Sequence, residues 1–313
     1  MLLMYLNCNH CNLQLDQLYE PGDVEFVKVR LNRFCESGTL RSMNLSHFKK
    51  TIWTRYRTHK RDFPWRRTRD PYKILVSEVM LQQTQAPRVV PKYLSFLKKF
   101  PTTQALANAP LSAVLSEWQG LGYNRRALYL KQCAEKIEKD FGGKWPRDFK
   151  TLCSLPGIGP ATAGDIMAFA WNIPTVVIET NIRSVFIHFF FAGAEKVSDK
   201  EILPLIEKTL DMENPREWYW ALFDYGAYLK SPQGRSAEEA ENPSRKSARH
   251  VKQSKFAGSN RQKRSQILKL ILQIIPIILS NNTNETATEK KVEFYESEAD
   301  IPYYKRPGNI ICH

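Results

Sequence analysis

The feature of this 313-residue chain that most limits its fold is a succession of amphipathic segments between residues 44 and 230. Apolar residues recur about every 3.6 positions, as one face of a helix requires. In the segment 126–141 the residues of that face are Ala127, Leu130, Ala134, Ile137 and Phe141. No run shows sustained strand alternation, since the β-branched residues 175–178 are too few. The sequence therefore predicts an all-α domain over residues 44–230.

The positions of the helices follow from this period and from terminal signals. We expect helices over residues 74–83, 89–99, 111–118, 126–141, 160–171, 180–191 and 199–211, besides one that begins near Asn44. Ser198 and Glu201 have the spacing of a capping box, which starts a helix. Pro215 suits the first turn of another helix, which runs to about Lys230.

The charge of the chain indicates a polyanionic partner. Lys and Arg outnumber Asp and Glu by 46 to 32, which gives a net charge of +14. Nucleic acid is the first candidate and a membrane surface the second. No apolar stretch approaches the roughly 18 residues of a transmembrane helix, and Met1–Leu6 lacks the basic start of a signal peptide. We expect an intracellular protein that does not enter a membrane.

Composition divides the rest of the chain. Residues 1–43 show no sustained period and are interpreted as an N-terminal extension. Residues 231–264 are rich in Ser, Asn, Lys and Arg, and no acidic residue occurs between residues 242 and 284. This basic arm is either a solvated face or an arm that follows phosphates, with equal weight. Residues 265–313 are expected to form a C-terminal helix and a polar tail.

The cysteines indicate neither disulfides nor a metal. Their positions are Cys8, Cys11, Cys35, Cys133, Cys153 and Cys312. Only Cys8 and Cys11 have ligand-like spacing, and a structural zinc ion would need two further ligands nearby. We therefore expect no metal site.

A glycine-rich turn gives the sharpest local signal. Residues 155–164 read Leu-Pro-Gly-Ile-Gly-Pro-Ala-Thr-Ala-Gly, so two glycines precede a helix that starts at Pro160. Backbone N–H groups at such a helix start can hold a phosphate. A tight turn between two helices, without a ligand, explains the same residues equally well.

Two carboxylates in different surroundings are candidates for acid-base chemistry. Glu78 is flanked by Val76, Val79 and Met80, so burial should raise its pKa and favour the protonated form. Glu179 follows an apolar run and starts a helix, where it could simply compensate the helix dipole. A protonated acid beside a carboxylate is the arrangement that cleaves glycosidic bonds.

Seven motifs in order carry a resemblance that covers residues 62–230. They are Pro64-Trp-Arg66, Asp70-Pro-Tyr-Lys73, Ser77-Glu-Val-Met-Leu-Gln-Gln-Thr-Gln85, Leu106-Ala-Asn-Ala-Pro110, Gly120-Leu-Gly-Tyr123, Leu155-Pro-Gly-Ile-Gly159 and Asp224-Tyr-Gly-Ala227. The segment resembles the helix-hairpin-helix DNA glycosylases, and most of all those that remove adenine mispaired with guanine or 8-oxoguanine. The resemblance implies two α-helical lobes with double-stranded DNA across the cleft and the target base flipped out between them.

The resemblance also implies roles for individual residues. Glu78 matches the catalytic acid, Glu179 the second carboxylate, and Asn181 a polar residue beside the sugar. Gln83 and Tyr123 match residues that enter the base stack, and Trp65 and Arg66 match part of the adenine pocket. The residues expected to contact phosphates are Gly157 and Gly159 of the hairpin and Arg245, Lys246, Lys252 and Lys255 of the basic arm.

The chain departs from the family pattern at several positions. Glu179 replaces the usual aspartate, which lengthens that side chain by one methylene. Ala161 stands where bifunctional relatives place a Schiff-base lysine, so we expect a monofunctional enzyme. Trp220 stands where a glutamine is common and is interpreted as a buried core aromatic. No cysteine occurs between Cys153 and Cys312, so we expect no iron-sulfur cluster and no other cofactor.

Three functions remain open from the sequence. The first is a monomeric adenine glycosylase acting on double-stranded DNA with a mispaired base. The second is a thymine or uracil mismatch glycosylase of the same fold, which Trp220 favours. The third is a DNA-binding relative that has lost catalysis because Glu179 misplaces the charge. The presence of Glu78 argues against the third, since binding alone does not need a buried acid.

Overall fold

The computed structural model describes residues 44–191, 193–231, 242–250 and 255–281, with side chains up to residue 274. The described elements belong to one compact unit. They are helical, and the one β pairing among them is an isolated bridge between Val197 and Ser247. The predicted all-α fold is confirmed. The extension 1–43 and the tail after residue 281 lie outside the described residues.

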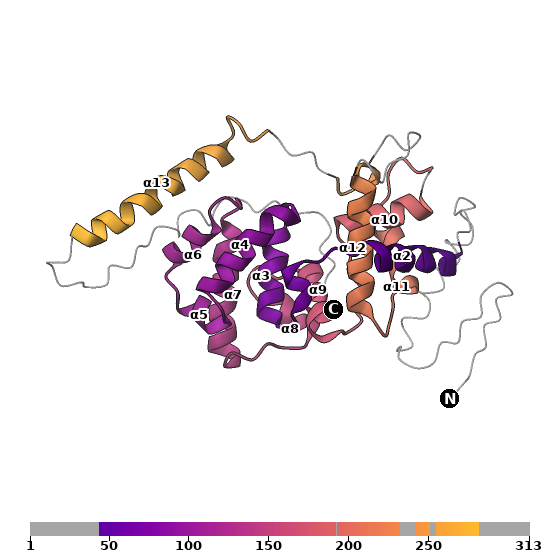
Figure 1. Cartoon of the computed structure of the whole chain (residues 1–313), viewed down its shortest axis with the longest axis horizontal. Helices are drawn as coiled ribbons and strands as arrows, with labels where there is room; N and C mark the ends of the chain where they lie inside the picture. Colours follow the sequence, from indigo (N-terminus) through magenta and orange to yellow (C-terminus); the bar gives the residue numbers. More distant parts are fainter. Residues whose placement is uncertain (1–43, 192, 232–241, 251–254, 282–313) are drawn as a thin grey trace, which may run out of the picture. The chain divides into compact units, whose positions relative to one another are not determined.

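The helices follow one another with short connections (Figure 1). Their bounds are α2 Leu45–His59, α3 Pro71–Leu81, α4 Ala86–Lys99, α5 Thr103–Asn108, α6 Leu111–Trp118, α7 Arg125–Phe141, α8 Phe149–Cys153, α9 Pro160–Trp171, α10 Thr180–Phe190, α11 Asp199–Thr209, α12 Pro215–Lys230 and α13 Asn260–Asn281, with 3-10 turns η1 Pro64–Arg67 and η3 Pro243–Lys246. The short helices α5 and α8 were not predicted, because five or six residues are too few to show a helical period.

Capping residues set the helix boundaries. Asp70 accepts a hydrogen bond from the Tyr72 backbone and starts α3 three residues before the predicted position. Ser198 and Glu201 form the predicted capping box at the start of α11. The side chain of Thr102 caps α5, and that of Asp148 caps α8. These capping residues are the sequence signal from which the two short helices could have been predicted.

The helices pack into two groups, which correspond to the two expected lobes. One group joins α3 to α4, α7 and α9, while α5 and α6 pack on α7 and α8 packs on α9. The other joins α12 to α2 and α10, and α10 to α11 and η3. Contacts between α9 and α12 connect the groups. The buried cores contain large aromatic residues such as Trp118 in the first group and Trp218 in the second, both 0% exposed.

Part of the basic arm is a packed element. The Val197 N–H donates to the carbonyl of Lys246 at 2.8 Å, and the Ala248 N–H donates to the carbonyl of Val197 at 2.8 Å. The Arg249 guanidinium lies 2.8 Å from Asp199. Backbone pairing and an ion pair therefore hold residues 242–250 against α11 and the end of α10, while the side chains of Arg245 and Arg249 stay exposed, so the choice between a solvated face and an arm that follows phosphates stays a prediction.

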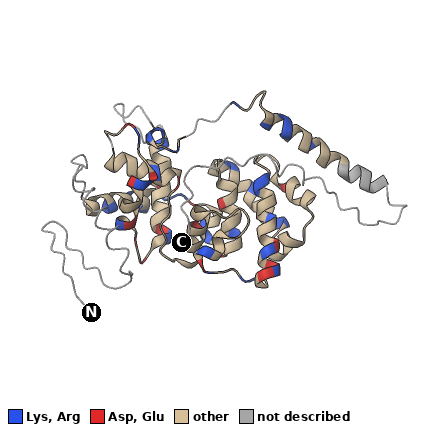
Figure 2. Ribbon diagram, turned by 180° about the vertical axis from the view of Figure 1, so that it is seen from behind, with Lys and Arg blue, Asp and Glu red and all other residues tan. Residues whose placement is uncertain are grey.

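The C-terminal helix begins earlier than predicted. The structure starts α13 at Asn260, inside the segment assigned to the basic arm, and extends it to Asn281. Lys and Arg also lie on α13 and on several helices of the domain (Figure 2). No helix in the described part of the chain has the length and apolar character needed to span a bilayer.

Candidate functional site

The glycine-rich turn joins α8 to α9. Gly157 has a φ of +75°, and a Cβ at this position would lie 2.7 Å from Cβ of Tyr129. Only glycine fits both the left-handed conformation and this close approach to α7. Gly159 is the N-cap of α9, and no atom lies within 4 Å of a Cβ placed there. The hairpin therefore presents the start of α9 with open space beside it.

Glu78 lies near the end of α3, between the buried residues Val79 and Ser77. Its side chain keeps partial exposure. Burial, reinforced by the negative charge of Glu179, raises the pKa of Glu78 to about 8, while the Arg66 guanidinium acts in the opposite sense. Glu78 is therefore protonated at neutral pH, as the sequence predicted.

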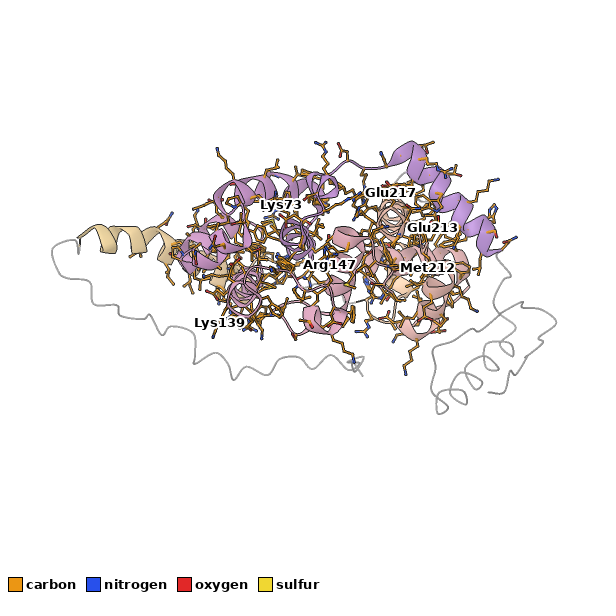
Figure 3. All side chains as sticks on the ribbon, turned by 90° about the horizontal axis from the view of Figure 1, so that it is seen from below. Lys73, Lys139, Arg147, Met212, Glu213 and Glu217 are labelled. Carbon is orange, nitrogen blue, oxygen red and sulfur yellow. The ribbon has the colours of Figure 1, made fainter. Side chains whose placement is uncertain are left out.

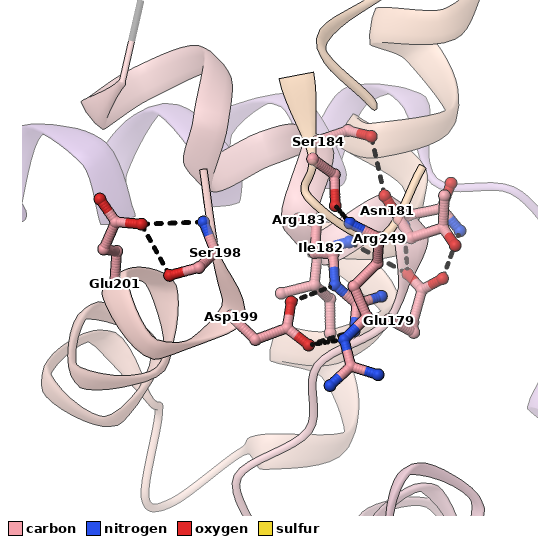
Figure 4. Close-up of polar contacts among 11 residues, drawn as sticks. Glu179, Asn181, Ile182, Arg183, Ser184, Ser198, Asp199, Glu201 and Arg249 are labelled. Atoms are coloured by element: carbon pink, nitrogen blue, oxygen red, sulfur yellow. Dashed lines mark hydrogen bonds and ion pairs between the residues drawn. The ribbon is translucent and has the colours of Figure 1, made fainter. Parts of the chain in front are cut away.

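Glu179 is the N-cap of α10 (Figure 4). Its Oε1 accepts the backbone N–H of Asn181 at 2.6 Å and of Ile182 at 3.0 Å, and its Oε2 accepts Nδ2 of Asn181 at 3.3 Å. Nζ of Lys230 donates to Oδ1 of Asn181 at 2.8 Å. The extra methylene of Glu179 is thus accommodated by folding the carboxylate back onto the start of its own helix.

The surroundings of Glu179 favour its ionised form relative to Glu78. Burial raises the pKa of Glu179, but the Lys230 ammonium, the two backbone N–H groups and Arg183 all lower it. The electrostatic coupling of Glu78 to Glu179 shows that α3 and α10 bring these two carboxyls into one site. The net effect leaves the pKa of Glu179 above its ordinary value, and its negative charge is one cause of the raised pKa of Glu78.

A third carboxyl, which was not selected from the sequence, belongs to the same site. Asp165 of α9 is 6% exposed, and its Oδ1 has no hydrogen-bond partner among the described residues. Burial and the negative charges of Glu78 and Glu179 raise the pKa of Asp165 well above its usual value. An acid within the apolar run Ala163–Ala170 was the signal that could have identified it.

A charged network fixes Arg66 beside these carboxyls. Nη1 and Nη2 of Arg66 donate to Oδ2 and Oδ1 of Asp224 at 2.9 and 2.8 Å, and Nε of Arg61 donates to Oδ1 of Asp224 at 2.6 Å. The side chains of Arg66 and Asp224 are only 8% and 7% exposed. Both arginines hold the pKa of Asp224 below its usual value, so the carboxylate stays charged. Asp224 had been quoted only as part of a motif.

Trp65, which was predicted to line the base pocket, and Trp220, which was interpreted as a core aromatic, lie in different surroundings. Trp65 is 7% exposed and stacks on Phe63 with ring centroids 4.8 Å apart, so its place in a pocket wall stays a prediction. Trp220 is partly exposed, and the Arg66 guanidinium lies 5.5 Å from its ring centroid. The interpretation of Trp220 as a core aromatic is wrong, because position 220 of α12 faces a cavity rather than the core of its group.

That cavity has a volume of about 450 Å³ and lies beside the carboxyl site. It is lined by Arg66, Arg67, Thr68, Arg69, Asn172, Asn214, Arg216, Glu217 and Trp220. Glu217 lies on the first turns of α12, close to Glu213 (Figure 3). Glu78 does not line this cavity, which shares Arg66 with the predicted base pocket.

Gln83 and Tyr123 occupy two strained loops that share one anchor. Both have positive φ, 57° and 51°, and both side chains are exposed. Nη1 of Arg126 donates to the carbonyls of Val79 at 2.7 Å and of Gln82, while its Nη2 donates to Gly122 at 3.1 Å. Arg126 therefore ties the end of α3, which carries Glu78, to the loop before Tyr123. No local sequence pattern marks this arginine.

The basic residues of the arm differ in accessibility. Arg245 and Lys255 are exposed, whereas Lys246 is half-buried within η3. Lys252 lies outside the described residues. The described residues hold no group of three or more His, Cys, Asp or Glu side chains that could bind a metal ion.

Comparisons with known proteins assign the family. Residues 76–210 match the model of the HhH-GPD superfamily base excision DNA repair protein. The chain is 33% identical over 241 residues to the adenine DNA glycosylase of Mycolicibacterium smegmatis, covering 73% of this chain and 81% of that protein. It is 35% identical over 174 residues to the adenine DNA glycosylase of Buchnera aphidicola, covering 54% of this chain and 49% of that protein.

A solved structure shows the same fold. The structure of a thermostable thymine-DNA glycosylase matches with a TM-score of 0.54 and 29% identity, covering 60% of this chain and 88% of that one. The chain spans about half the length of the Buchnera relative, or 49%. Together, the matched residues, the identity and the shared architecture show that the chain belongs to the HhH-GPD superfamily of base excision DNA repair proteins.

Proposed function

We propose that this chain is a monofunctional adenine DNA glycosylase, which hydrolyses the N-glycosidic bond of adenine mispaired with guanine or 8-oxoguanine. The observation that carries the proposal is the pair of carboxyls Glu78 and Glu179, since the charge of Glu179 raises the pKa of Glu78 while Lys230 and two backbone N–H groups favour the ionised form of Glu179. Such a pair supplies both a proton donor and a stabilising negative charge. The names of the curated relatives support adenine as the base.

The proposed reaction uses each carboxyl once. Glu78 donates its proton to the departing adenine as the bond between C1′ and the base nitrogen breaks. The ionised Glu179 stabilises the positive charge that develops on the sugar. Water then adds its hydroxyl to C1′ and returns a proton to Glu78. The products are free adenine and an abasic site in the DNA.

The loops anchored by Arg126 fit the flipping of a base. Tyr123 and Gln83 are exposed at positions from which they could enter the base stack, where stacking contributes about 1–3 kcal/mol per base. Arg66, which Asp224 holds in place, would donate hydrogen bonds to the flipped base. We place the phosphates at the N–H groups around Gly157 and Gly159 and at Arg245, Lys246 and Lys255.

The proposal includes no iron-sulfur cluster and no other cofactor. The residues that follow α12 do not supply thiolate ligands, since no cysteine occurs between Cys153 and Cys312. The protein would act as a monomer on double-stranded DNA inside the cell.

A thymine or uracil mismatch glycosylase is the second candidate. One observation favours it, namely the similarity to a thymine-DNA glycosylase structure. A tryptophan offers a stacking face to either kind of base, so the pocket alone does not distinguish a purine from a pyrimidine.

The released base separates the candidates. Purified protein is incubated with duplexes carrying A opposite G, A opposite 8-oxoguanine, T opposite G and U opposite G, with a fully paired duplex as control, and abasic sites are scored by alkaline cleavage. We expect cleavage in the two adenine mispairs alone. Cleavage confined to the T or U duplexes would support the second candidate function. Tight binding without any cleavage would indicate a non-catalytic relative.

A further inference from the structure

The cavity of about 450 Å³ carries an excess of positive charge. Its wall contains one carboxylate and four guanidinium groups, which belong to Glu217 and to Arg66, Arg67, Arg69 and Arg216. The volume lies within the range of roughly 300–1,000 Å³ that small-molecule sites occupy. A concave surface with an excess of one charge concentrates ligands of the opposite charge. The ligand of this cavity should therefore be an anion.

Carboxylates of the chain neutralise two of these arginines. Arg66 is bound to Asp224 at 2.8 and 2.9 Å, and Nε of Arg67 donates to Oδ1 of Asp62 at 3.0 Å. Arg69 is exposed, and it makes no hydrogen bond or ion pair with a residue that the structure describes. Arg69 and the fourth arginine therefore provide the charge that remains for a ligand.

The fourth arginine, Arg216, is buried in the wall and held in one orientation. It is 9% exposed, and it donates through Nε to the carbonyl of Phe169 at 2.6 Å and through Nη2 to that of Ala170 at 3.1 Å. These carbonyl groups near the end of α9 orient the guanidinium without neutralising its charge. No described residue accepts a hydrogen bond from its Nη1, so this nitrogen is left for a ligand.

The two remaining positive charges repel each other across the cavity. Burial lowers the pKa of Arg216, the positive charge of Arg69 lowers it further, and Glu217 acts in the opposite sense. Glu217 is exposed on the first turn of α12, and within the described residues no ion pair joins it to either arginine. An anion between the two guanidinium groups would replace this repulsion by two attractions.

Neutral groups complete the wall. Asn214 is the N-cap of α12, and its side chain makes no capping hydrogen bond. The Thr68 hydroxyl accepts the backbone N–H of Asp70 at 3.1 Å, which leaves its own proton for another acceptor. Trp220 is partly exposed in the same wall and adds an aromatic surface. Arginines beside neutral donors suit a phosphate group, and the indole suits an organic group attached to it.

We propose that this cavity binds a phosphate monoester of a small molecule, with its phosphate between Arg69 and Arg216 and its organic part against Trp220. Guanidinium groups match the geometry of phosphate oxygens, to which they donate in pairs. The site is separate from the phosphate contacts proposed for DNA at the glycine hairpin. The cavity lies at the C-terminal end of α9 and the hairpin at its N-terminal end, and 12 helical residues span about 18 Å.

Calorimetric titration of the full chain with adenosine 5′-monophosphate tests the proposal at low salt, where charges are least screened. Arg69→Ala should weaken binding by about tenfold, the effect of losing a hydrogen bond to a charged group. Glu217→Gln should strengthen binding by about two- to fivefold, because an exposed negative charge beside the phosphate is removed. Both side chains are exposed, so neither replacement alters the core. Arg264→Ala removes an exposed arginine of α13 outside the cavity and should leave the affinity unchanged.

Three further titrations identify what the site recognises. Adenosine, which lacks the phosphate, should not bind measurably, and inorganic phosphate should bind more weakly than the nucleotide because it does not reach Trp220. A saturating amount of duplex DNA should leave the affinity for the nucleotide within about twofold, since the hairpin lies about 18 Å away.

The proposal would be overturned by wild-type protein that does not bind the nucleotide, or by Arg69→Ala with wild-type affinity. Adenosine that binds as tightly as its monophosphate would show recognition of the base alone and would also overturn it. Displacement of the nucleotide by duplex DNA would make the site a contact for DNA phosphates and exclude a small molecule. Ligand binding is measured without base release, so failure of the proposed glycosylase function would leave these results unaffected.

Discussion

The end of α3 and the start of α10 each present a glutamate to the same site, but by opposite means. Burial and the negative charge of Glu179 raise the pKa of Glu78 to about 8, against the opposite effect of Arg66. Glu179 is buried as well, yet it accepts two backbone N–H groups and an amide, and a lysine lies behind that amide. Two identical side chains thereby acquire different protonation states.

The comparison shows which physical factor assigns each role. Desolvation alone favours a neutral acid, which can donate a proton. Desolvation combined with a helix N-terminus and a cation permits a charged carboxylate, which can stabilise a developing cation. The chemical difference between the two glutamates therefore comes from the helix end that each one occupies.

Removal of the proton donor should give the largest effect. We expect Glu78→Gln to reduce base release by about 10³-fold, within the range of general acid catalysis, and to leave DNA affinity close to wild type. Glutamine has the shape of the protonated acid, so folding at neutral pH should be unaffected. Single-turnover cleavage and DNA-binding titrations measure the two properties, with Glu207→Gln on the exposed face of α11 as control. Wild-type release by Glu78→Gln would remove the acid from the mechanism.

Neutralisation of the second carboxylate should have a smaller effect. We expect Glu179→Gln to lower base release by about 10²-fold, the cost of losing one preorganised electrostatic contact, because the amide still caps α10 but carries no negative charge. The alkaline limb of the pH profile, which belongs to Glu78, should also move. Since the charge of Glu179 raises the pKa of Glu78, its removal should shift that limb to lower pH. A limb that stays in place would show that the two carboxyls do not interact.

Replacement of Asp165 should have the smallest effect on catalysis and a visible effect on stability. Asn is isosteric with the protonated acid, so base release near neutral pH should change little in Asp165→Asn. The raised pKa of Asp165 means that the folded state binds this proton more tightly than the unfolded state, so its contribution to stability is lost as pH rises from about 4 through the folded pKa.

Thermal unfolding across pH measures this contribution. The melting temperature of Asp165→Asn should rise relative to the wild type as pH increases. A difference that is constant with pH would show that Asp165 does not carry a proton in the folded protein.

Much of the fold could be predicted from local pattern. The long helices show a clear apolar period, and the capping box at Ser198 identified the start of α11. The raised pKa of Glu78 was predicted from its apolar neighbours in sequence, because α3 is a largely buried helix. The turn at Gly157 was identified from two glycines, although its close approach to Tyr129 was not.

The remaining features depend on contacts between distant segments. Asp224 is joined to Arg66 across 158 positions, and Lys230 to Asn181 across 49, so neither pairing leaves a local sequence period. Arg126 lies in an amphipathic helix like any exposed basic residue, yet it binds carbonyl groups at the end of α3. The packing of residues 242–250 against Val197 likewise depends on backbone groups, which carry no sequence signal.

The protonation states of the two glutamates are the central claim, and carbon NMR of their carboxyl groups in the free protein measures them most directly. Spectra recorded across pH, with Glu78→Gln and Glu179→Gln to assign the two signals, give the pKa of each group. The account predicts that Glu78 titrates near pH 8 and that Glu179 titrates at lower pH. A pKa of Glu78 near the ordinary glutamate value of about 4.3 would contradict the account. A pKa of Glu179 higher than that of Glu78 would contradict it as well.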